Sequence, residues 1–185
     1  MNLIKIENEN SDIPFFLCLA AGISAQNKQI YSSAFTAGTL IVHGSLGNRI
    51  TNGYNLGLEF ETRSKGIAVY LNSRINITKE NASTQDFYWG NNDNKRSFSL
   101  IEVNAGPRFY IGNMKELYVN IDLGFGLYTG SYLRETLWGP QIGAGFNYPV
   151  TTGFSLVLNG RLNVIGFDEG FIYTGIHSGL KFSFE

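Results

Sequence analysis

Hydrophobic and polar residues alternate one by one in eight segments of the chain, from about residue 31 to the C-terminal end. The clearest segment, 117–127, carries a large apolar residue at every odd position, and its even positions include Asn120, Asp122, Gly124 and Gly126. Successive side chains of a β-strand point to opposite faces, so such a segment has one apolar face and one small or polar face. No helical period fits this pattern. The sequence therefore predicts eight strands joined by turns.

The expected strands are joined by links of unequal length. Strands are expected at about 32–43, 53–62, 66–78, 97–111, 117–127, 137–148 and 154–165, with an eighth strand after residue 170. Links after the second, fourth, sixth and seventh strands are short, whereas those after the first, third and fifth are longer, and 79–96 is the longest. Long loops on one rim and tight turns on the other are typical of outer-membrane barrels. We therefore predict an all-β fold, an eight-stranded antiparallel up-and-down transmembrane β-barrel.

At two positions the sequence predicts a local departure from regular strand geometry. The run Ser64-Lys65-Gly66 is expected to form a tight turn in which Gly66 supplies the positive φ, because glycine adopts that conformation without steric cost. Pro107 has no backbone N–H and would interrupt a central strand. We therefore expect a bulge or a strand end at Pro107.

The chemistry of the two strand faces indicates which one points outward. A soluble barrel of the lipocalin type has an apolar interior and a wet, charged exterior. The non-apolar face of these strands is instead rich in Gly and Asn, and only 16% of the residues are charged, against about 25% in typical domains. Such a face fits the inside of a narrow cylinder whose apolar face contacts lipid. A soluble ligand-binding barrel remains the alternative.

The charges expected inside the barrel balance in sign, which a closed interior requires because unpaired buried charge is costly. His177 is expected to join them as a hydrogen-bonding residue of the lumen. The acidic members of this expected network are Glu59, Glu61, Glu102 and Asp122, and the basic members are Arg74, Arg108, Arg161 and Lys181.

Strand length and aromatic residues agree with a membrane setting. A membrane-spanning strand needs about 9–11 residues, and the segments are of that order. Aromatic residues near the strand ends are expected to form girdles at the two membrane interfaces. These residues are Tyr54, Phe109, Tyr128, Trp138, Tyr148, Phe154 and Phe184.

The N-terminal part of the chain reads differently from the rest. Residues 15–25 form a short apolar run that ends in small residues, which resembles a secretory signal peptide cleaved after Ala25. The preceding residues are atypical, because Lys5 is outnumbered by acidic residues. We expect 1–25 to be the leader and 26–185 the barrel domain, and the alternative is a buried N-terminal helix or strand.

Composition excludes several other kinds of protein. The net charge is −1 and no run of basic residues occurs, so a nucleic-acid partner is not expected. Cys18, the single cysteine, lies within the expected leader, which leaves no disulfide in the barrel. No His, Asp or Glu cluster has the spacing of a metal site, so we expect neither a metal nor another cofactor.

Three segments, 103–110, 118–126 and 180–184, resemble the small outer-membrane β-barrel proteins of Gram-negative bacteria. This family includes the transmembrane domain of outer membrane protein A and OmpX. The segment 180–184 resembles the sorting signal that the barrel assembly machinery reads, although Glu185 follows the aromatic Phe184 here. The resemblance implies the outer membrane as the location, with membrane lipid and lipopolysaccharide as surroundings.

The specific role is less constrained than the fold. We favour a non-enzymatic barrel with a polar, closed lumen, whose exposed loops serve adhesion, surface protection or envelope integrity. The loop at 79–96 would carry recognition through Tyr88 and Trp89. A small porin-like channel is the alternative. A lipid-modifying enzyme is disfavoured, because His177 and Ser178 are neighbours on a strand and point to opposite faces, so no catalytic residues are expected.

Overall fold

The computed structural model describes residues 29–48, 50–79, 97–113, 115–131, 133, 135–166 and 171–184. These residues form eight strands and one short helix. The elements are β1 (Ile30–His43), α2 (Gly44–Gly47), β2 (Gly53–Ser64), β3 (Ile67–Lys79), β4 (Ser97–Ile111), β5 (Tyr118–Gly130), β6 (Leu137–Thr151), β7 (Phe154–Ile165) and β8 (Phe171–Phe184).

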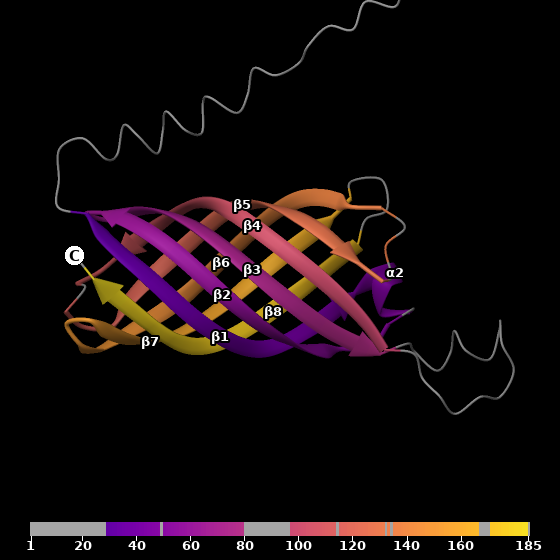
Figure 1. The fold of residues 1–185 in the computed structure, drawn as a ribbon, viewed down its shortest axis with the longest axis horizontal. Coiled ribbons are helices and arrows are strands. Elements are labelled where there is room, and N and C mark those ends of the chain that lie inside the picture. Colours follow the sequence, from indigo (N-terminus) through magenta and orange to yellow (C-terminus); the bar gives the residue numbers. More distant parts are fainter. Residues whose placement is uncertain are drawn as a thin grey trace, which may run out of the picture.

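The eight strands close into one barrel (Figure 1). Each strand pairs antiparallel with the next along the chain, and β8 pairs with β1 from Tyr31 opposite Phe184 to His43 opposite Ile172. Closure leaves no sheet edge unpaired, which a β-structure in lipid requires. The predicted eight-stranded up-and-down barrel is confirmed, and β1, β2, β5 and β6 each extend two or three residues beyond an end that the sequence pattern indicates. Among the described helices, none has the length and apolar character needed to span a membrane.

The two rims of the barrel differ in how the strands are connected. At one end, which we call the turn rim, the connections are 65–66, 112–117 and 152–153, and the first residue of β1 and the last of β8 lie at the same end (Figure 1). At the opposite end, the loop rim, the connections are 44–52, 80–96, 131–136 and 166–170. The two longest connections, 44–52 and 80–96, lie at the loop rim, as the sequence predicts, whereas 131–136 and 166–170 at that rim are no longer than 112–117 at the turn rim.

The tight turn between β2 and β3 uses a different residue from the one expected. Lys65 has a φ of 56°, in the left-handed region, whereas Gly66 is not among the residues with positive φ. The prediction that Gly66 would supply the positive φ is wrong. A side chain with a Cβ atom therefore occupies the left-handed position, which is unfavourable by roughly 1–2 kcal/mol for an L-residue.

Pro107 neither ends β4 nor introduces a bulge. Strand β4 continues through it, and Pro107 pairs with Val69 of β3. On the other side, the pairs between β4 and β5 stop after Ala105 and resume at Arg108 with unchanged register. The ladder is therefore interrupted locally without a shift, and the expected bulge or strand end is wrong. The register shift in the described sheet lies instead between Pro149 and Thr151 of β6.

Candidate functional site

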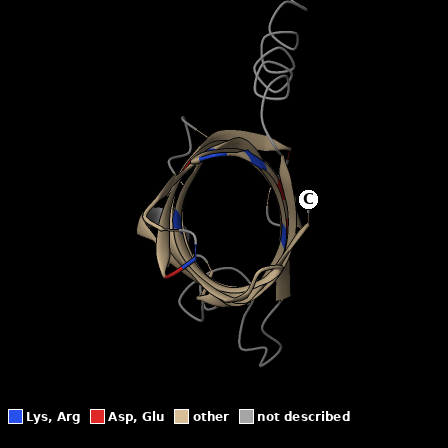
Figure 2. Ribbon diagram, turned by 90° about the vertical axis from the view of Figure 1, so that its left-hand side faces the viewer, with Lys and Arg blue, Asp and Glu red and all other residues tan. Residues whose placement is uncertain are grey.

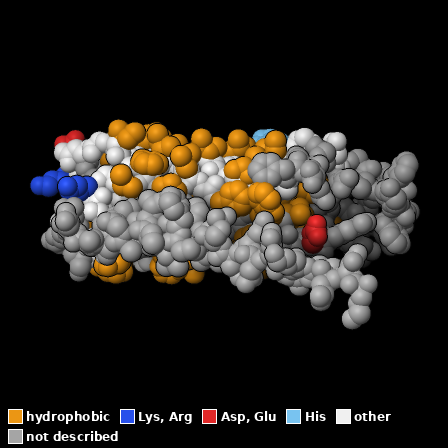
Figure 3. Space-filling model, turned by 90° about the horizontal axis from the view of Figure 1, so that it is seen from above, with side chains coloured by type: hydrophobic (Ala, Val, Ile, Leu, Met, Phe, Trp, Pro, Cys, Tyr) orange, Lys and Arg blue, Asp and Glu red, His pale blue; other side chains and the backbone are white. Residues whose placement is uncertain are grey.

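The outside of the barrel is apolar along its whole circumference. On every strand, alternate large hydrophobic side chains are exposed, among them Phe35, Leu71, Leu123, Leu158 and Leu180. Where Figure 3 leaves the strands uncovered, hydrophobic side chains occupy the length of the barrel and the few charged ones lie towards its ends. Soluble monomers seldom expose apolar patches beyond a few hundred Å². A lipocalin-type barrel would have the opposite distribution, so the structure disfavours the soluble alternative.

The nine residues expected to form a polar network all lie inside the barrel and are at most 5% exposed. Figure 2, a view along the barrel, shows charged positions spread around the closed ring of strands. The residues come from six of the eight strands. They are Glu59 and Glu61 of β2, Arg74 of β3, Glu102 and Arg108 of β4, Asp122 of β5, Arg161 of β7, and His177 and Lys181 of β8.

Arg108 is the centre of the largest group of ion pairs. Its Nε and Nη2 atoms donate to the two carboxylate oxygens of Asp122 at 2.6 and 2.8 Å, which is a forked, bidentate contact. Its Nη1 atom donates to Glu61 at 2.8 Å, and both terminal nitrogens donate to Glu59. Arg161, on β7, joins the same group. It donates to Glu59, and its Nη2 atom lies 3.1 Å from Oδ2 of Asp122. We call Glu59, Glu61, Arg108, Asp122 and Arg161 the Arg108 cluster.

On the side of the turn rim, the Arg108 cluster continues through Lys181 and Tyr110. The Lys181 ammonium donates to both oxygens of Glu61, at 3.0 and 2.9 Å, and to the Tyr110 hydroxyl at 2.6 Å. The Tyr110 hydroxyl in turn donates to Glu61. Each of these carboxylates thus has more than one charged or hydroxyl donor, which offsets the desolvation cost of burying it.

A second, separate ion pair lies nearer the loop rim. Arg74 donates to Glu102 at 3.0 Å, and both side chains are 1% exposed. Asn76 donates to the other Glu102 oxygen at 3.3 Å, and the Tyr173 hydroxyl donates to that oxygen as well. The ion pairs of the described lumen therefore form two groups.

Glycines opposite the long side chains make room for them in the narrow barrel. A Cβ atom on Gly143 would lie 2.8 Å from Cγ of Arg161, and one on Gly124 would lie 2.2 Å from the Tyr70 hydroxyl. The Tyr70 ring in turn lies against both guanidinium groups, with its centre 4.9 Å from Cζ of Arg108 and 5.2 Å from Cζ of Arg161. The many glycines on the inner face are thus needed for packing the lumen.

His177 lies in the lumen, beside Asn55 of β2. Its Nδ1 atom is hydrogen-bonded to the amide oxygen of Asn55 at 2.9 Å, and it is 2% exposed. Ser178, its neighbour, points outward and is exposed. His43 is exposed at the loop rim and is hydrogen-bonded to Thr174 at 2.8 Å. In the described part of the chain, no three His, Cys, Asp or Glu side chains come together as a metal site would require.

Two single residues of the interior were missed or misplaced by sequence reasoning. Arg63, at the end of β2, is 6% exposed and lies with its guanidinium 5.0 Å from the Tyr110 ring centre. Tyr128, assigned to a lipid-facing girdle, is fully buried inside the barrel, so that assignment is wrong. Tyr128 has the same alternation parity as Asp122, and strict counting along β5 would have placed it inside.

The larger omission is an apolar group at the mouth of the barrel near the loop rim. Inward-facing positions change there from polar to apolar residues. We call this group the mouth cluster, and it consists of the buried residues Leu40, Ile50, Tyr128, Ile165, Phe171 and Tyr173, packed against Val42, Phe98, Leu100, Leu133 and Leu137.

Comparison with known proteins shows the fold. No family model and no curated protein matches the chain. Neisserial surface protein A matches with a TM-score of 0.60 and 15% identity, covering 85% of this chain and 100% of that one. The outer membrane protein AlkL in DMPC bilayers matches with a TM-score of 0.50 and 11% identity, over 100% and 97% of the two chains. This protein has the fold of the small outer-membrane β-barrels.

Two expectations for this outer-membrane-type barrel lie outside the described residues. The first is the proposed leader at 1–25. The second is the recognition loop with Tyr88 and Trp89, which belongs to the connection between β3 and β4. Both remain predictions from the sequence.

Proposed function

We propose that the protein is a non-enzymatic integral barrel of the outer membrane of a Gram-negative bacterium, and that its own polar side chains close its lumen. The observation that carries this proposal is the arrangement of the two faces. Large apolar side chains are exposed around the outside, while eight charged side chains are buried and paired inside. This arrangement is stable where hydrocarbon surrounds the barrel, since exposed apolar surface of this extent would be costly in water.

Closure of the lumen is supported by the span of the Arg108 cluster. Its members come from β2, β4, β5 and β7, so the ion pairs cross the interior instead of lining one wall. An eight-stranded barrel has an interior just wide enough for side chains to fill. Uncompensated charge of one sign would favour a selective pore, whereas here each carboxylate of the cluster contacts at least one cation.

A small channel is the second candidate, and one observation favours it. Several inward-facing amide atoms have no hydrogen-bond partner among the described residues, including Nδ2 of Asn55, Nδ2 of Asn72 and Oδ1 of Asn159. Polar atoms of this kind are the partners that internal water uses. The small-channel candidate requires that such water form a continuous path, wide enough for ions, past the Arg108 cluster.

The surface role is proposed for the loop rim. The two longest connections lie there, and loops held on a rigid barrel are where binding residues concentrate. We assign adhesion, surface protection or envelope integrity to this rim, with Tyr88 and Trp89 of the 79–96 loop as the recognition residues. Outer-membrane lipid and lipopolysaccharide would surround the barrel, and the barrel assembly machinery would insert it.

Two measurements on the full chain test the proposal. Membrane fractionation should place the protein in the outer membrane, resistant to carbonate extraction, with heat-dependent mobility on SDS gels. Planar-bilayer recordings should then show no sustained channel of uniform conductance. Release by carbonate would overturn the membrane location, and uniform long-lived channels would favour the pore instead.

A further inference from the structure

Arg74 of β3 and Arg161 of β7 bring two guanidinium groups to neighbouring inward positions of β2. Arg74 lies against Gly57, where a Cβ atom would be 3.0 Å from the Nε atom of Arg74. Arg161 donates to Glu59, the next inward residue of the same strand. The two guanidinium groups are close enough for Arg161 to act electrostatically on Arg74. Two buried cations that repel each other are stabilised by a negative charge placed between them.

Several N–H groups around these guanidinium groups have no hydrogen-bond partner among the described residues. They are Nε of Arg74, Nε and Nη1 of Arg161, Nδ2 of Asn55 and Nδ2 of Asn72. Asn55 is the inward residue before Gly57, and its Oδ1 atom accepts from Nδ1 of His177 at 2.9 Å, which leaves Nδ2 free. Asn72 lies opposite Glu59 in the β2–β3 register. These side chains are at most 2% exposed, so bulk water does not satisfy the free donors, and each needs an acceptor.

Donors and positive charge are both in excess in the described lumen. Among its enclosed atoms without a partner, eight are donor nitrogens of Asn or Arg side chains and four are amide oxygens. The described lumen also buries five Arg and Lys side chains, Arg63 included, against four carboxylates. Water brings donors and acceptors in equal number and no charge, so water alone leaves both excesses. An anion accepts hydrogen bonds without donating any and removes one unit of positive charge.

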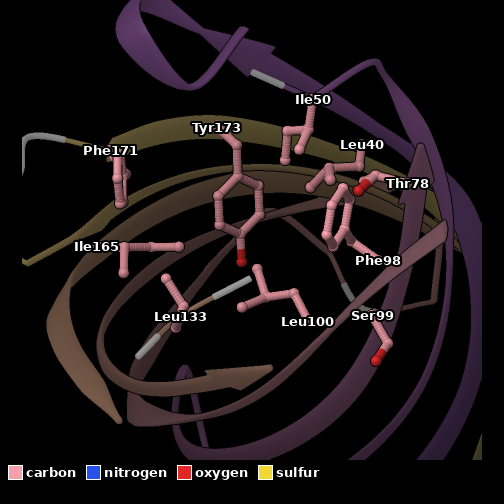
Figure 4. Close-up of a pocket in the computed structure, with 10 residues that line it drawn as sticks. All are labelled: Leu40, Ile50, Thr78, Phe98, Ser99, Leu100, Leu133, Ile165, Phe171 and Tyr173. Atoms are coloured by element: carbon pink, nitrogen blue, oxygen red, sulfur yellow. The ribbon is translucent and has the colours of Figure 1, made fainter. Parts of the chain in front are cut away.

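The surroundings of these donors favour a single small ion. The closed sheet encloses them laterally, and the Arg108 cluster crosses the lumen on the side of the turn rim. On the side of the loop rim lies the mouth cluster, whose Leu40 and Tyr173 side chains extend into the barrel mouth (Figure 4). The adjoining wall has short inward residues, since Thr36 pairs with Gly57 on one side and Gly179 on the other. Such a wall leaves space for one atom-sized ion more readily than for a polyatomic one.

We propose that the lumen holds one small monovalent anion of the halide class, bound by the free N–H groups of Arg74, Arg161 and Asn55. The ion accepts hydrogen bonds that no described oxygen accepts, and its charge balances the fifth buried cation. The site rests on the closed lumen of the proposed function, because an open channel would let the ion pass instead of holding it. An enclosed ion enters as the barrel folds, so its binding is measured through the stability of the barrel.

The first test compares salts of a small and a large anion. The full chain is unfolded with urea and refolded in lipid vesicles, in mixtures of sodium chloride and sodium gluconate at constant ionic strength. Once chloride exceeds the Kd, each tenfold rise in chloride should lower the unfolding equilibrium constant about tenfold, which is the dependence expected for one bound ion. Gluconate is too large to replace chloride in the site. An unfolding constant that does not change with chloride would overturn the proposal.

Two asparagines of the lumen provide a matched pair of variants. Asn55→Asp places a carboxylate of the same size among the free donors, so the chain itself supplies the negative charge and the dependence on chloride should disappear. Asn104→Asp is the control, because the Asn104 amide nitrogen already donates to Asn72 and its free atom is an oxygen. This variant should keep the tenfold dependence of wild type. Equal dependence on chloride in the two variants would contradict the assignment.

A direct measurement on the wild-type barrel keeps the test decisive if Asn55→Asp does not fold. Crystals of the full chain refolded in sodium bromide should give an anomalous diffraction peak inside the lumen, within hydrogen-bond distance of the free nitrogens of Arg74 and Arg161. Density without an anomalous signal at that position would identify water and overturn the proposal, as would bromide found on the outside alone. A barrel that keeps its heat-dependent mobility and carbonate resistance but holds no ion would refute this inference and leave the proposed function intact.

Discussion

Replacing Arg108 by methionine is expected to destabilise the barrel more than any other single change in the lumen. The substitution keeps much of the side-chain volume but removes the cation that contacts Glu59, Glu61 and Asp122. Lys181 still contacts Glu61, but Arg161 then remains as the one cation of the Arg108 cluster, and it contacts both Glu59 and Asp122. The cluster would thus retain an unbalanced buried negative charge.

The size of the effect follows from this imbalance. Removing one partner of a buried ion pair typically costs about 3–5 kcal/mol, because the other charge stays buried without compensation. We therefore expect Arg108→Met to lower the free energy of unfolding by about 3–5 kcal/mol, which is roughly a hundredfold to a few thousandfold in the equilibrium constant. Urea titration of the barrel in lipid vesicles, followed by tryptophan fluorescence, measures this change.

Two further variants separate charge balance from geometry. Arg108→Lys keeps the charge but loses the bidentate contact with Asp122, so it should cost less than Arg108→Met. The double variant Arg108→Met with Asp122→Asn removes one charge of each sign and should recover roughly 1–3 kcal/mol relative to Arg108→Met alone. A loss below about 1 kcal/mol in Arg108→Met, or no recovery in the double variant, would refute the assignment of Arg108 as the centre of the cluster.

The remaining predictions use the same urea titration. Gly139→Ala places a Cβ atom 1.8 Å from a backbone oxygen of β7 and should cost about 1–3 kcal/mol, whereas Gly160→Ala, with its nearest atom at 4.0 Å, should stay within about 0.5 kcal/mol of wild type. Lys65→Gly should stabilise the barrel by about 1 kcal/mol, because glycine tolerates a φ of 56°; a loss of stability would contradict the strain. Leu158→Lys should cost about 2–4 kcal/mol and Tyr148→Lys, near the turn rim, about 0–1, and equal costs would argue against a depth-dependent apolar exterior.

The alternation of residues was sufficient to predict the strands and the direction of their faces. A period of two is unambiguous over segments of 12 to 15 residues, so the outward position of Leu123 and the inward position of Asp122 follow directly. The balance of charge on the inner face also follows from composition. These features depend only on local order along the chain.

The partners within the lumen could not be predicted in the same way. Arg108 lies on β4 and contacts Glu59 of β2, one strand removed, while Arg161 of β7 contacts Glu59 from another side of the barrel. These pairings depend on strand tilt and on the stagger that closes the barrel, which residue alternation does not determine. A long side chain can reach several partners at a similar level along the barrel axis, so only the closed structure identifies the pairs.

The mouth cluster was missed because the rule of a polar inner face was applied along the whole length of each strand. The inner face was treated as polar from rim to rim, yet Leu40, Ile165 and Tyr173 occupy inward positions by parity alone. Aromatic residues near strand ends were assigned to girdles without regard to parity, which misplaced Tyr128. Pro107 was expected to break its strand, but the loss of a single N–H interrupts the ladder only locally, since both neighbouring registers are held on either side.

Contact between the apolar exterior and lipid is the claim on which the account depends. Nitroxide labels at Leu123 and Leu158, compared with a label at the exposed turn residue Lys115, test it directly in the reconstituted barrel. Frequent collision of a label with dissolved oxygen indicates a hydrocarbon environment. Frequent collision with a water-soluble nickel chelate indicates an aqueous environment. We predict high oxygen and low nickel accessibility at Leu123 and Leu158, with the opposite at Lys115. Nickel accessibility at Leu123 and Leu158 equal to that at Lys115 would contradict the account.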